Sequence, residues 1–515
     1  MTKENKKLKT IGLVIAITLL GKVLGLVRDM LLGQTFGTGL EADALTTAIH
    51  LPRMFFDVVF ASAVTASFIP VFTEVLQGEG EDSAKTLAYS FFTLVGMVGL
   101  AFSALGMAIA PRLVNGIYNF DPETAALTAR LLQIIFPSIF FTGIAFSMVG
   151  ILNAFGQFHI PAAMSIASNG ILIVYFLFFV SPFGVYGAAV ALLLGWAAQA
   201  IMQVPSLRKN GYGYRPRFRH PGIPKILKLM LPVMASTWVL PINMIVLVGF
   251  ASGIPGGAAS INLANGLYVI IAGIFVLSVT NVIFPEMSRL SAAGEQGKLA
   301  AMVKKTLCAL LFLLIPMTVG LMALSTPLVR LLYEYQQFDA DSTAKTASVL
   351  FFMSIGMVAF GVQNVLVRLF YAKKQGRAPL ISGVVGVLVN ALLCVLLIEP
   401  MGLAGLGLAH ALSLIVATLV LLNPTEKLLQ ASFMNRQFFV SILKMLLAAL
   451  VMGLLVVVTR TALEPVVADG VLGRLVLFFV PAGLGAGAYF VGAAALKIEE
   501  MNTVKNIIFR RGGTS

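Results

Sequence analysis

Three ionisable residues interrupt the first apolar stretch of the chain, in the segment GKVLGLVRDMLLG at residues 21–33: Lys22, Arg28 and Asp29. On an insertion scale, each such charge at the centre of a lipid-facing helix costs about 2.5–3.5 kcal/mol, whereas each Leu, Ile, Val or Phe returns only about 0.3–0.6 kcal/mol. The charges would therefore cancel most of the insertion energy of this helix if they faced lipid. We expect them to face protein or water, as ionisable residues within membrane helices usually do.

The next apolar stretch carries a second set of ionisable residues. Asp43, His50 and Asp57 recur at intervals of seven and so share one stripe of a helix, and Arg53 is one turn from both His50 and Asp57. At a rise of about 1.5 Å per residue, the two helices place cations at matching depths with acids beside them. Paired positive charges of this kind could bind an anion such as a phosphate.

We interpret these residues as one polar site within the membrane. The predicted anion-binding residues are Lys22, Arg28 and Arg53. The residues predicted to line or gate the cavity are Asp29, Asp43, His50 and Asp57. The alternative is that the acids only neutralise the cations in buried ion pairs that hold the helices together.

The composition indicates what must position these side chains. Of 515 residues, 58% are hydrophobic and 11% are charged, and the mean hydropathy is +0.94, which is typical of a polytopic membrane protein. Continuous apolar runs long enough to span a membrane predict an all-α protein of about 14 transmembrane helices. The runs centre near residues 22, 57, 97, 138, 170, 194, 237, 271, 314, 357, 388, 412, 448 and 484.

Lys and Arg residues fall mainly in every second connection, which predicts that both termini are cytoplasmic. The largest basic connection, RKNGYGYRPRFRH at residues 208–220, is expected to form a solvated face, with contact to lipid phosphate as a secondary role. A basic inner face also accounts for the net charge of +14, so we expect no nucleic-acid partner.

The chain repeats itself at a shift of 218 residues. The sequence Phe120-Asp121 recurs as Phe338-Asp339, and further matched pairs are Gln157 with Gln375, Pro161 with Pro379, Gly184 with Gly402 and Gly187 with Gly405. We predict two six-helix lobes, 1–210 and 211–430, followed by two additional helices in 431–515. Because each lobe has an even number of spans, the lobes are parallel repeats, an arrangement in which transporters bind substrate between the halves.

The chain resembles, over essentially its whole length, the MurJ (MviN) family of lipid II flippases in the MOP exporter superfamily. The resemblance rests on the R-D pair of residues 28–29, on FGTGLEADA at residues 36–44, on PRLVNGIY at 111–118 and on LNAFGQFHIPA at 152–162. It implies two lobes around a cationic cavity, with the last two helices forming a groove for a polyprenyl tail. It also implies substrate-site roles for Lys22, Arg28 and Asp43, while Asn265-Gly266 replaces an Asp-Arg pair of the family.

The resemblance implies a flippase that moves lipid II, the undecaprenyl-diphosphate-linked disaccharide-peptide, from the inner to the outer leaflet of the bacterial cytoplasmic membrane. We expect alternating access, with no cofactor and no metal, driven by the membrane potential or by an unidentified coupling ion. Membrane lipids and other cell-wall synthesis proteins are the further expected partners. The alternatives are a flippase for another polyprenyl-diphosphate-linked glycan, and a membrane enzyme acting on lipid-linked sugar. An enzyme would need paired carboxylates or a metal cluster, which the scattered loop acids do not predict.

Overall fold

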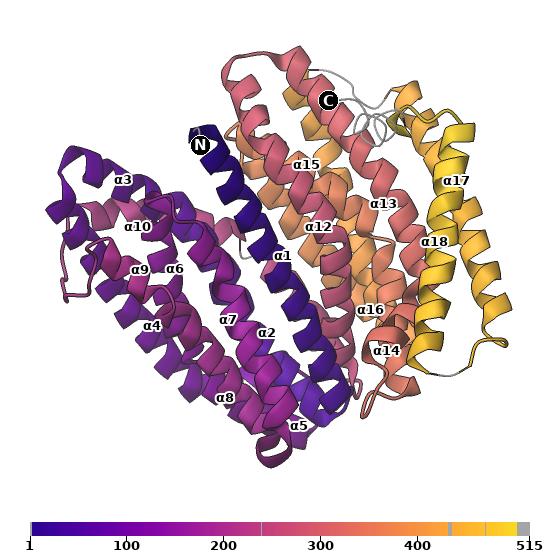
Figure 1. The fold of residues 1–515 in the computed structure, drawn as a ribbon, viewed down its shortest axis with the longest axis horizontal. Coiled ribbons are helices and arrows are strands. Elements are labelled where there is room, and N and C mark those ends of the chain that lie inside the picture. The colour runs from indigo at the N-terminus through magenta and orange to yellow at the C-terminus, as the bar shows by residue number, and fades with distance from the viewer. Residues whose placement is uncertain (1–2, 238, 431–434, 469, 502–515) are drawn as a thin grey trace. The chain divides into compact units, whose positions relative to one another are not determined.

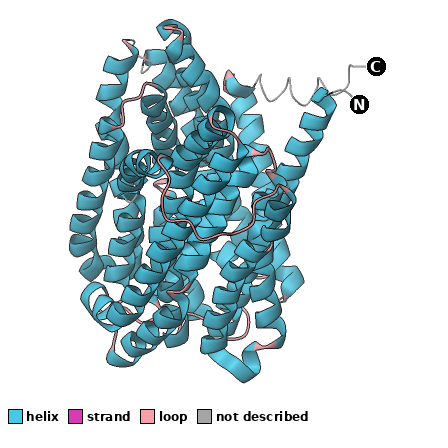
Figure 2. Ribbon diagram, turned by 90° about the vertical axis from the view of Figure 1, so that its left-hand side faces the viewer, coloured by secondary structure: helices cyan, strands magenta, loops and turns pink. Residues whose placement is uncertain are grey.

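The protein is described by a computed structural model that covers residues 3–237, 239–430, 435–468 and 470–501 (Figure 1). Throughout these ranges the regular structure is helical, and no strand occurs in them (Figure 2). The predicted all-α membrane fold is therefore confirmed. Within the same ranges, nine helices are long and apolar enough to cross a membrane. The number becomes ten if α14 (Ala340–Ser354) and α15 (Met357–Ala372), which meet at a bend of 49°, form one span.

Each of the fourteen predicted span centres lies in a helix. Two of them, at 388 and 412, share the 53-residue helix α16, which is broken between them at Gly402. The count of fourteen membrane crossings stays a prediction, because several of the helices that contain these centres are not among the nine or ten candidates.

The chain divides into two compact units, Met1–Ala259 and Ser260–Ser515. In the first unit, α1 packs mainly against α7, α2 against α5, α4 against α5 and α6, and α10 against α2. Its elements are α1 (Lys3–Phe36), α2 (Leu40–Ala63), the π-helical turn η1 (Val64–Phe68), α3 (Ile69–Gly78), α4 (Glu81–Ile117), α5 (Pro122–Ile135), α6 (Ser138–Ala154), α7 (His159–Phe178), α8 (Val180–Ile201), α9 (Val204–Lys209), α10 (Gly222–Thr237) and α11 (Val239–Ala251). These units describe packing, whereas the boundary near residue 210 describes a sequence repeat and stays a prediction.

The second unit contains most of α12, which begins at the end of the first unit. Its helices are α12 (Gly257–Ala292), α13 (Gln296–Tyr333), α14 (Ala340–Ser354), α15 (Met357–Ala372), α16 (Arg377–Leu429), α17 (Arg436–Leu463) and α18 (Val471–Ala495). The last two helices pack against each other and against α13 (Figure 1). The C-terminal addition is thus held by α13.

The backbone repeats the pattern that the sequence predicted. Gly184 breaks α8 with φ 51°, and Gly402 breaks α16 with φ 57°. The turn after α6 has Gly156 at φ 72°, and the turn after α15 has Lys374 at φ 58°. Each pair is separated by 218 residues, and both turns are closed by matching backbone hydrogen bonds. The 218-residue repeat therefore extends to individual torsion angles.

The acids of the two Phe-Asp dipeptides cap equivalent helices. The Asp121 carboxylate accepts hydrogen bonds from the N–H groups of Glu123 (3.0 Å) and Thr124 (3.1 Å) at the start of α5. The Asp339 carboxylate accepts one from the N–H of Ser342 (2.8 Å) at the start of α14. A side-chain acceptor at this position satisfies an N–H group that the helix itself cannot pair.

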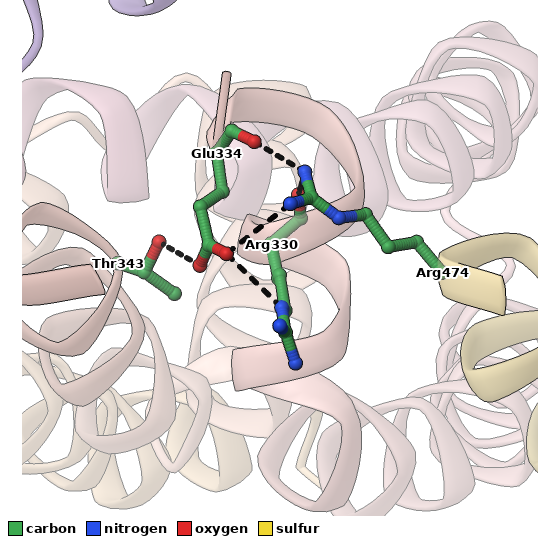
Figure 3. Close-up of polar contacts among 4 residues, drawn as sticks. All are labelled: Arg330, Glu334, Thr343 and Arg474. Atoms are coloured by element: carbon green, nitrogen blue, oxygen red, sulfur yellow. Dashed lines mark hydrogen bonds and ion pairs between the residues drawn. The ribbon is translucent and has the colours of Figure 1, made fainter. Parts of the chain in front are cut away.

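A polar cluster joins α13, α14 and α18 (Figure 3). Glu334 Oε1 accepts from Arg330 Nε (3.0 Å) and Arg474 Nη2 (3.4 Å), and Oε2 accepts from the Thr343 hydroxyl (2.7 Å). Arg474 also donates to the backbone oxygens of Arg330 and Glu334, and its guanidinium lies 4.6 Å from the centre of the Tyr335 ring. One acid therefore ties the C-terminal addition to α13 and α14.

Candidate functional site

Arg28 on α1 is held by two partners. Its Nε and Nη2 donate to Asp29 Oδ1 at 2.9 and 2.6 Å, and its Nη1 donates to Asn169 Oδ1 on α7 at 3.0 Å. The side chains of Arg28 and Asp29 keep 19% and 26% of their surface exposed. Three of the five guanidinium N–H groups are used in these bonds. The guanidinium is therefore held in one orientation, and two N–H groups remain to bind another group.

The close packing of α1 on α7 makes this arrangement possible. Asn169 is buried, and its Nδ2 also donates to the carbonyl oxygen of Gly21 at 3.1 Å. A Cβ atom at Gly21 would lie 2.1 Å from Ser165 Oγ and 3.3 Å from Ser165 Cβ, so a larger residue would have to displace the Ser165 side chain. Asn169 thus joins the α1 backbone to the Arg28 guanidinium within one helix pair.

Lys22 lies on an exposed part of α1, next to the exposed apolar side chains of Leu19 and Val23. It makes no hydrogen bond or ion pair with any residue that the structure describes. The alternative, in which a neighbouring acid neutralises this cation, is therefore not seen among those residues.

Asp43 is buried and caps the start of α12. Its Oδ2 accepts from the Gly256 N–H at 2.8 Å, and its Oδ1 accepts from the Ala259 N–H at 2.7 Å. Gly256 has φ 76°, and a Cβ there would lie 2.4 Å from the Thr38 carbonyl oxygen. A carboxylate at a helix N-terminus is stabilised by unpaired N–H groups and by the helix dipole. The structure thus shows Asp43 in a capping role that the sequence did not suggest.

His50 and Arg53 lie on the following turns of α2. His50 is partly exposed, and both Arg53 and Arg28 are close enough to act on it electrostatically. Arg53 is exposed and lines a pocket inside the first unit. The side chain of Asp57 lies outside the described residues. The structure therefore brings Arg28, His50 and Arg53 into one electrostatic neighbourhood.

The pocket beside Arg53 is formed by α2, α5, α6 and α8. Its lining includes Pro52, Ser138, Thr142, Leu192 and Trp196. No pattern in the sequence singled out these residues or Asn169. An uncharged polar residue in an apolar span, such as Asn169, was the available signal, because such groups need a hydrogen-bond partner when buried.

The fold resembles that of transporters of the MOP superfamily. An inward-facing MATE family multidrug resistance transporter of that superfamily superposes with a TM-score of 0.69 at 16% identity, covering 81% of this chain and 98% of that chain. The solved structure of a lipid II flippase MurJ in an inward closed conformation matches with a TM-score of 0.79 at 25% identity, covering 94% of this chain and 98% of that chain.

The family model of the lipid II flippase MurJ matches residues 32–478. The chain therefore belongs to the MurJ family of lipid II flippases, which are transporters and not enzymes. The probable lipid II flippase MurJ of Bdellovibrio bacteriovorus is 26% identical over 518 residues, with 98% of both chains covered. The probable lipid II flippase MurJ of Thermotoga maritima is 28% identical over 498 residues, covering 96% of this chain and 97% of the relative.

Proposed function

We propose that this protein moves lipid II from the inner to the outer leaflet of the bacterial cytoplasmic membrane by alternating access. Both termini lie on the cytoplasmic side in this proposal. Lys22, Arg28 and Arg53 bind the diphosphate of the head group while the lipid tail stays in the bilayer. Support comes from the family to which the chain belongs and from the arrangement of these cations in the first unit.

The observation that carries the proposal is the orientation of the Arg28 guanidinium on α1 by hydrogen bonds to Asp29 and Asn169. Arg53 on α2 lines a pocket in the same unit and, like Arg28, lies within electrostatic range of His50. Guanidinium groups suit a diphosphate because their planar donors can bind two oxygens at once. Arg28 is already oriented by Asp29 and Asn169, and two of its N–H groups are not used by those partners.

The membrane potential can drive the step without a cofactor. With the inside of the cell negative, each negative charge that moves outward gains about 2.3 kcal/mol per 100 mV. The membrane potential therefore favours export of the anionic head group. Membrane lipids and other cell-wall synthesis proteins are further proposed partners.

Neutralising the two α1 cations tests the proposal. A charge-assisted hydrogen bond contributes about 1.5–3 kcal/mol, so losing two of them removes about 3 kcal/mol or more of binding. This corresponds to a fall of about 100-fold in lipid II translocation by the Lys22→Ala/Arg28→Ala variant in proteoliposomes. The same variant is expected to fail in cells depleted of their own lipid II flippase.

Arg289→Ala is the matched control, because Arg289 is exposed and, within the described ranges, its ion pair is with Glu286 on its own helix. It should translocate lipid II at the rate of the unchanged protein. Unchanged translocation by the double variant would contradict the proposal. Selective transport of a different polyprenyl-diphosphate-linked glycan would overturn the choice of lipid II and keep the cation site.

A further inference from the structure

The segment between α9 and α10 is extended but anchored at both ends. Tyr212 is fully buried, with its ring centre 5.8 Å from that of Phe72 and 5.5 Å from that of Phe155. His220 is also buried. The seven residues between them, 213–219, are all exposed and have no regular secondary structure. The two buried residues therefore fix where this segment lies.

Three hydrogen-bonded positions hold the segment against α4. His220 Nδ1 accepts from the Gly222 N–H at 3.0 Å, so a neutral His220 ring carries its proton on Nε2, which lies 3.0 Å from Ser83 Oγ. Further along, the Arg217 N–H donates to Thr93 Oγ1 at 3.3 Å, and the Tyr214 hydroxyl lies 3.4 Å from the same oxygen. The segment is thus tied to α4 at Ser83 through the His220 side chain, and at Thr93 through the Arg217 backbone and the Tyr214 hydroxyl.

Thr93 marks the place where the surface of α4 changes character. Before it, the helix exposes charged residues such as Glu81 and Asp82. After it, the exposed side chains are apolar and belong to Met97, Val98, Leu100, Phe102 and Leu105. A band of exposed apolar side chains on a membrane-spanning helix faces lipid. The segment 213–219 is therefore tied to α4 at the edge of the lipid-facing band.

The exposed side chains of the segment combine two chemistries. Tyr214 and Phe218 expose 60% and 71% of their surface. Arg215, Arg217 and Arg219 alternate with them and are exposed as well. The sequence from 208 to 222 contains no acid. Aromatic rings are favoured at the level of lipid head groups, and clustered arginines attract anionic lipid.

We propose that residues 213–219 form a lipid-binding surface that holds the phosphate groups of anionic phospholipids. Phe218 and Tyr214 enter the head-group region, and the three arginines bind phosphate oxygens beside them. The occupant is a bilayer lipid because the segment adjoins the lipid-facing part of α4 and carries the complementary charge. This surface is separate from the cation site of α1 and α2 and does not depend on the transport of lipid II.

Retention of lipid by the purified protein measures how much the three arginines contribute to the binding of anionic lipid. The full chain is reconstituted in nanodiscs of phosphatidylcholine and phosphatidylglycerol without lipid II, and bound lipids are counted by native mass spectrometry. The unchanged protein should retain phosphatidylglycerol selectively. The variant Arg215→Gln/Arg217→Gln/Arg219→Gln should lose this selectivity by about fivefold per arginine. The matched control Arg289→Gln/Lys298→Gln/Lys305→Gln removes the same charge elsewhere, where two of the cations are paired with acids.

Equal phosphatidylglycerol retention by the arginine variant and the unchanged protein would overturn the proposal. A second measurement needs no loss of arginine. A spin label at Phe218→Cys, with Cys308 and Cys394 replaced by Ala, should be relaxed by lipid-dissolved oxygen more than by a water-soluble nickel complex. The reverse preference would mean that the segment faces water or an aqueous partner, and would exclude the lipid surface.

Discussion

The two repeats differ where their second, fourth and sixth predicted spans meet. In the first, α2, α6 and α8 surround a pocket that Arg53, Thr142 and Leu192 help to line. In the second, the equivalent helices α12, α15 and α16 bring together Tyr268, Phe360 and His410, with the Tyr268 ring centre 5.9 Å from Phe360 and 6.1 Å from His410. Phe360 and His410 are the residues 218 positions after Thr142 and Leu192.

This difference indicates that the two repeats serve different purposes, transport in the first and stability in the second. The first repeat has a pocket with a cation beside it, whereas the second places three packed rings at the matching positions. The Tyr268 hydroxyl and His410 Nδ1 have no hydrogen-bond partner among the described residues, so the cluster is held together by packing. Stability is therefore expected to depend on the second site, and transport on the first.

Comparing the stability and the transport activity of one variant at each site is the strongest test of this difference between the repeats. Tyr268→Ala removes a buried ring and should lower the free energy of unfolding by about 3–5 kcal/mol. Arg53→Ala removes an exposed side chain and should change it by less than about 1 kcal/mol while lowering lipid II translocation. Denaturant titration in detergent and transport in proteoliposomes measure the two quantities.

Tyr268→Phe is the control, because it keeps the ring and removes only the unpaired hydroxyl. It should leave stability unchanged or slightly higher, since an unpaired buried hydroxyl carries a desolvation cost. The comparison fails if Tyr268→Ala unfolds as easily as the unchanged protein, or if Arg53→Ala destabilises as much as Tyr268→Ala does.

The segments around the C-terminal ends of α4 and α13 differ between the repeats as well. From Pro327 to Phe338 the chain advances eleven residues and includes Glu334, whereas from Pro111 to Phe120 it advances nine and contains no acid. Only the second repeat has to hold two additional helices, and Glu334 supplies that contact through Arg474 (Figure 3). The presence of Glu334 is thus explained by its contact with α18, and the first repeat has no corresponding acid.

Glu334→Gln should therefore destabilise the protein by about 1–3 kcal/mol, because it weakens charge-assisted bonds in a partly buried site. Glu286→Gln removes an acid from an exposed pair and should cost no more than about 1 kcal/mol. Protease cutting between α17 and α18 should become faster in the first variant only. Equal effects of the two substitutions would show that Glu334 does not anchor α18.

The two capping acids should give the smallest effects. Replacing Asp121 or Asp339 by Ala should cost about 0.5–2 kcal/mol. The loss should be larger at Asp121, which accepts from two backbone N–H groups and from the Thr124 hydroxyl. Unfolding titrations of the two single variants measure this difference, and a larger loss at Asp339 would contradict it.

These caps also predict a dependence on pH. Hydrogen bonding from Thr124 lowers the pKa of Asp121, and that from the backbone of Ser342 lowers the pKa of Asp339. A carboxylate with a lowered pKa stabilises the fold above its unfolded pKa of about 3.9, and this stabilisation is lost as the pH falls through the lower folded value. The Asp121→Asn/Asp339→Asn variant should therefore lose less stability than the unchanged protein below about pH 4.

The sequence predicted the backbone better than the side-chain partners. Hydropathy and the 218-residue shift predicted the helices, and Gly184 and Gly402 both proved to be helix breaks. The pairing of Arg28 with Asn169 joins residues 141 positions apart, and no periodicity within one helix can indicate such a contact. Asp43 was expected to line or gate the cavity, which stays a prediction, and the structure shows in addition that it caps α12. No local pattern identifies which distant helix start an acid will reach.

Lys374 occupies a left-handed turn at the position where the earlier repeat has Gly156. Lysine adopts such a conformation at a cost that glycine avoids. The left-handed backbone conformation is thus present in both repeats, although the second repeat has lysine in place of glycine at this position. Ancient duplications in other long apolar chains can accordingly be traced through matched torsion angles after their side chains have diverged.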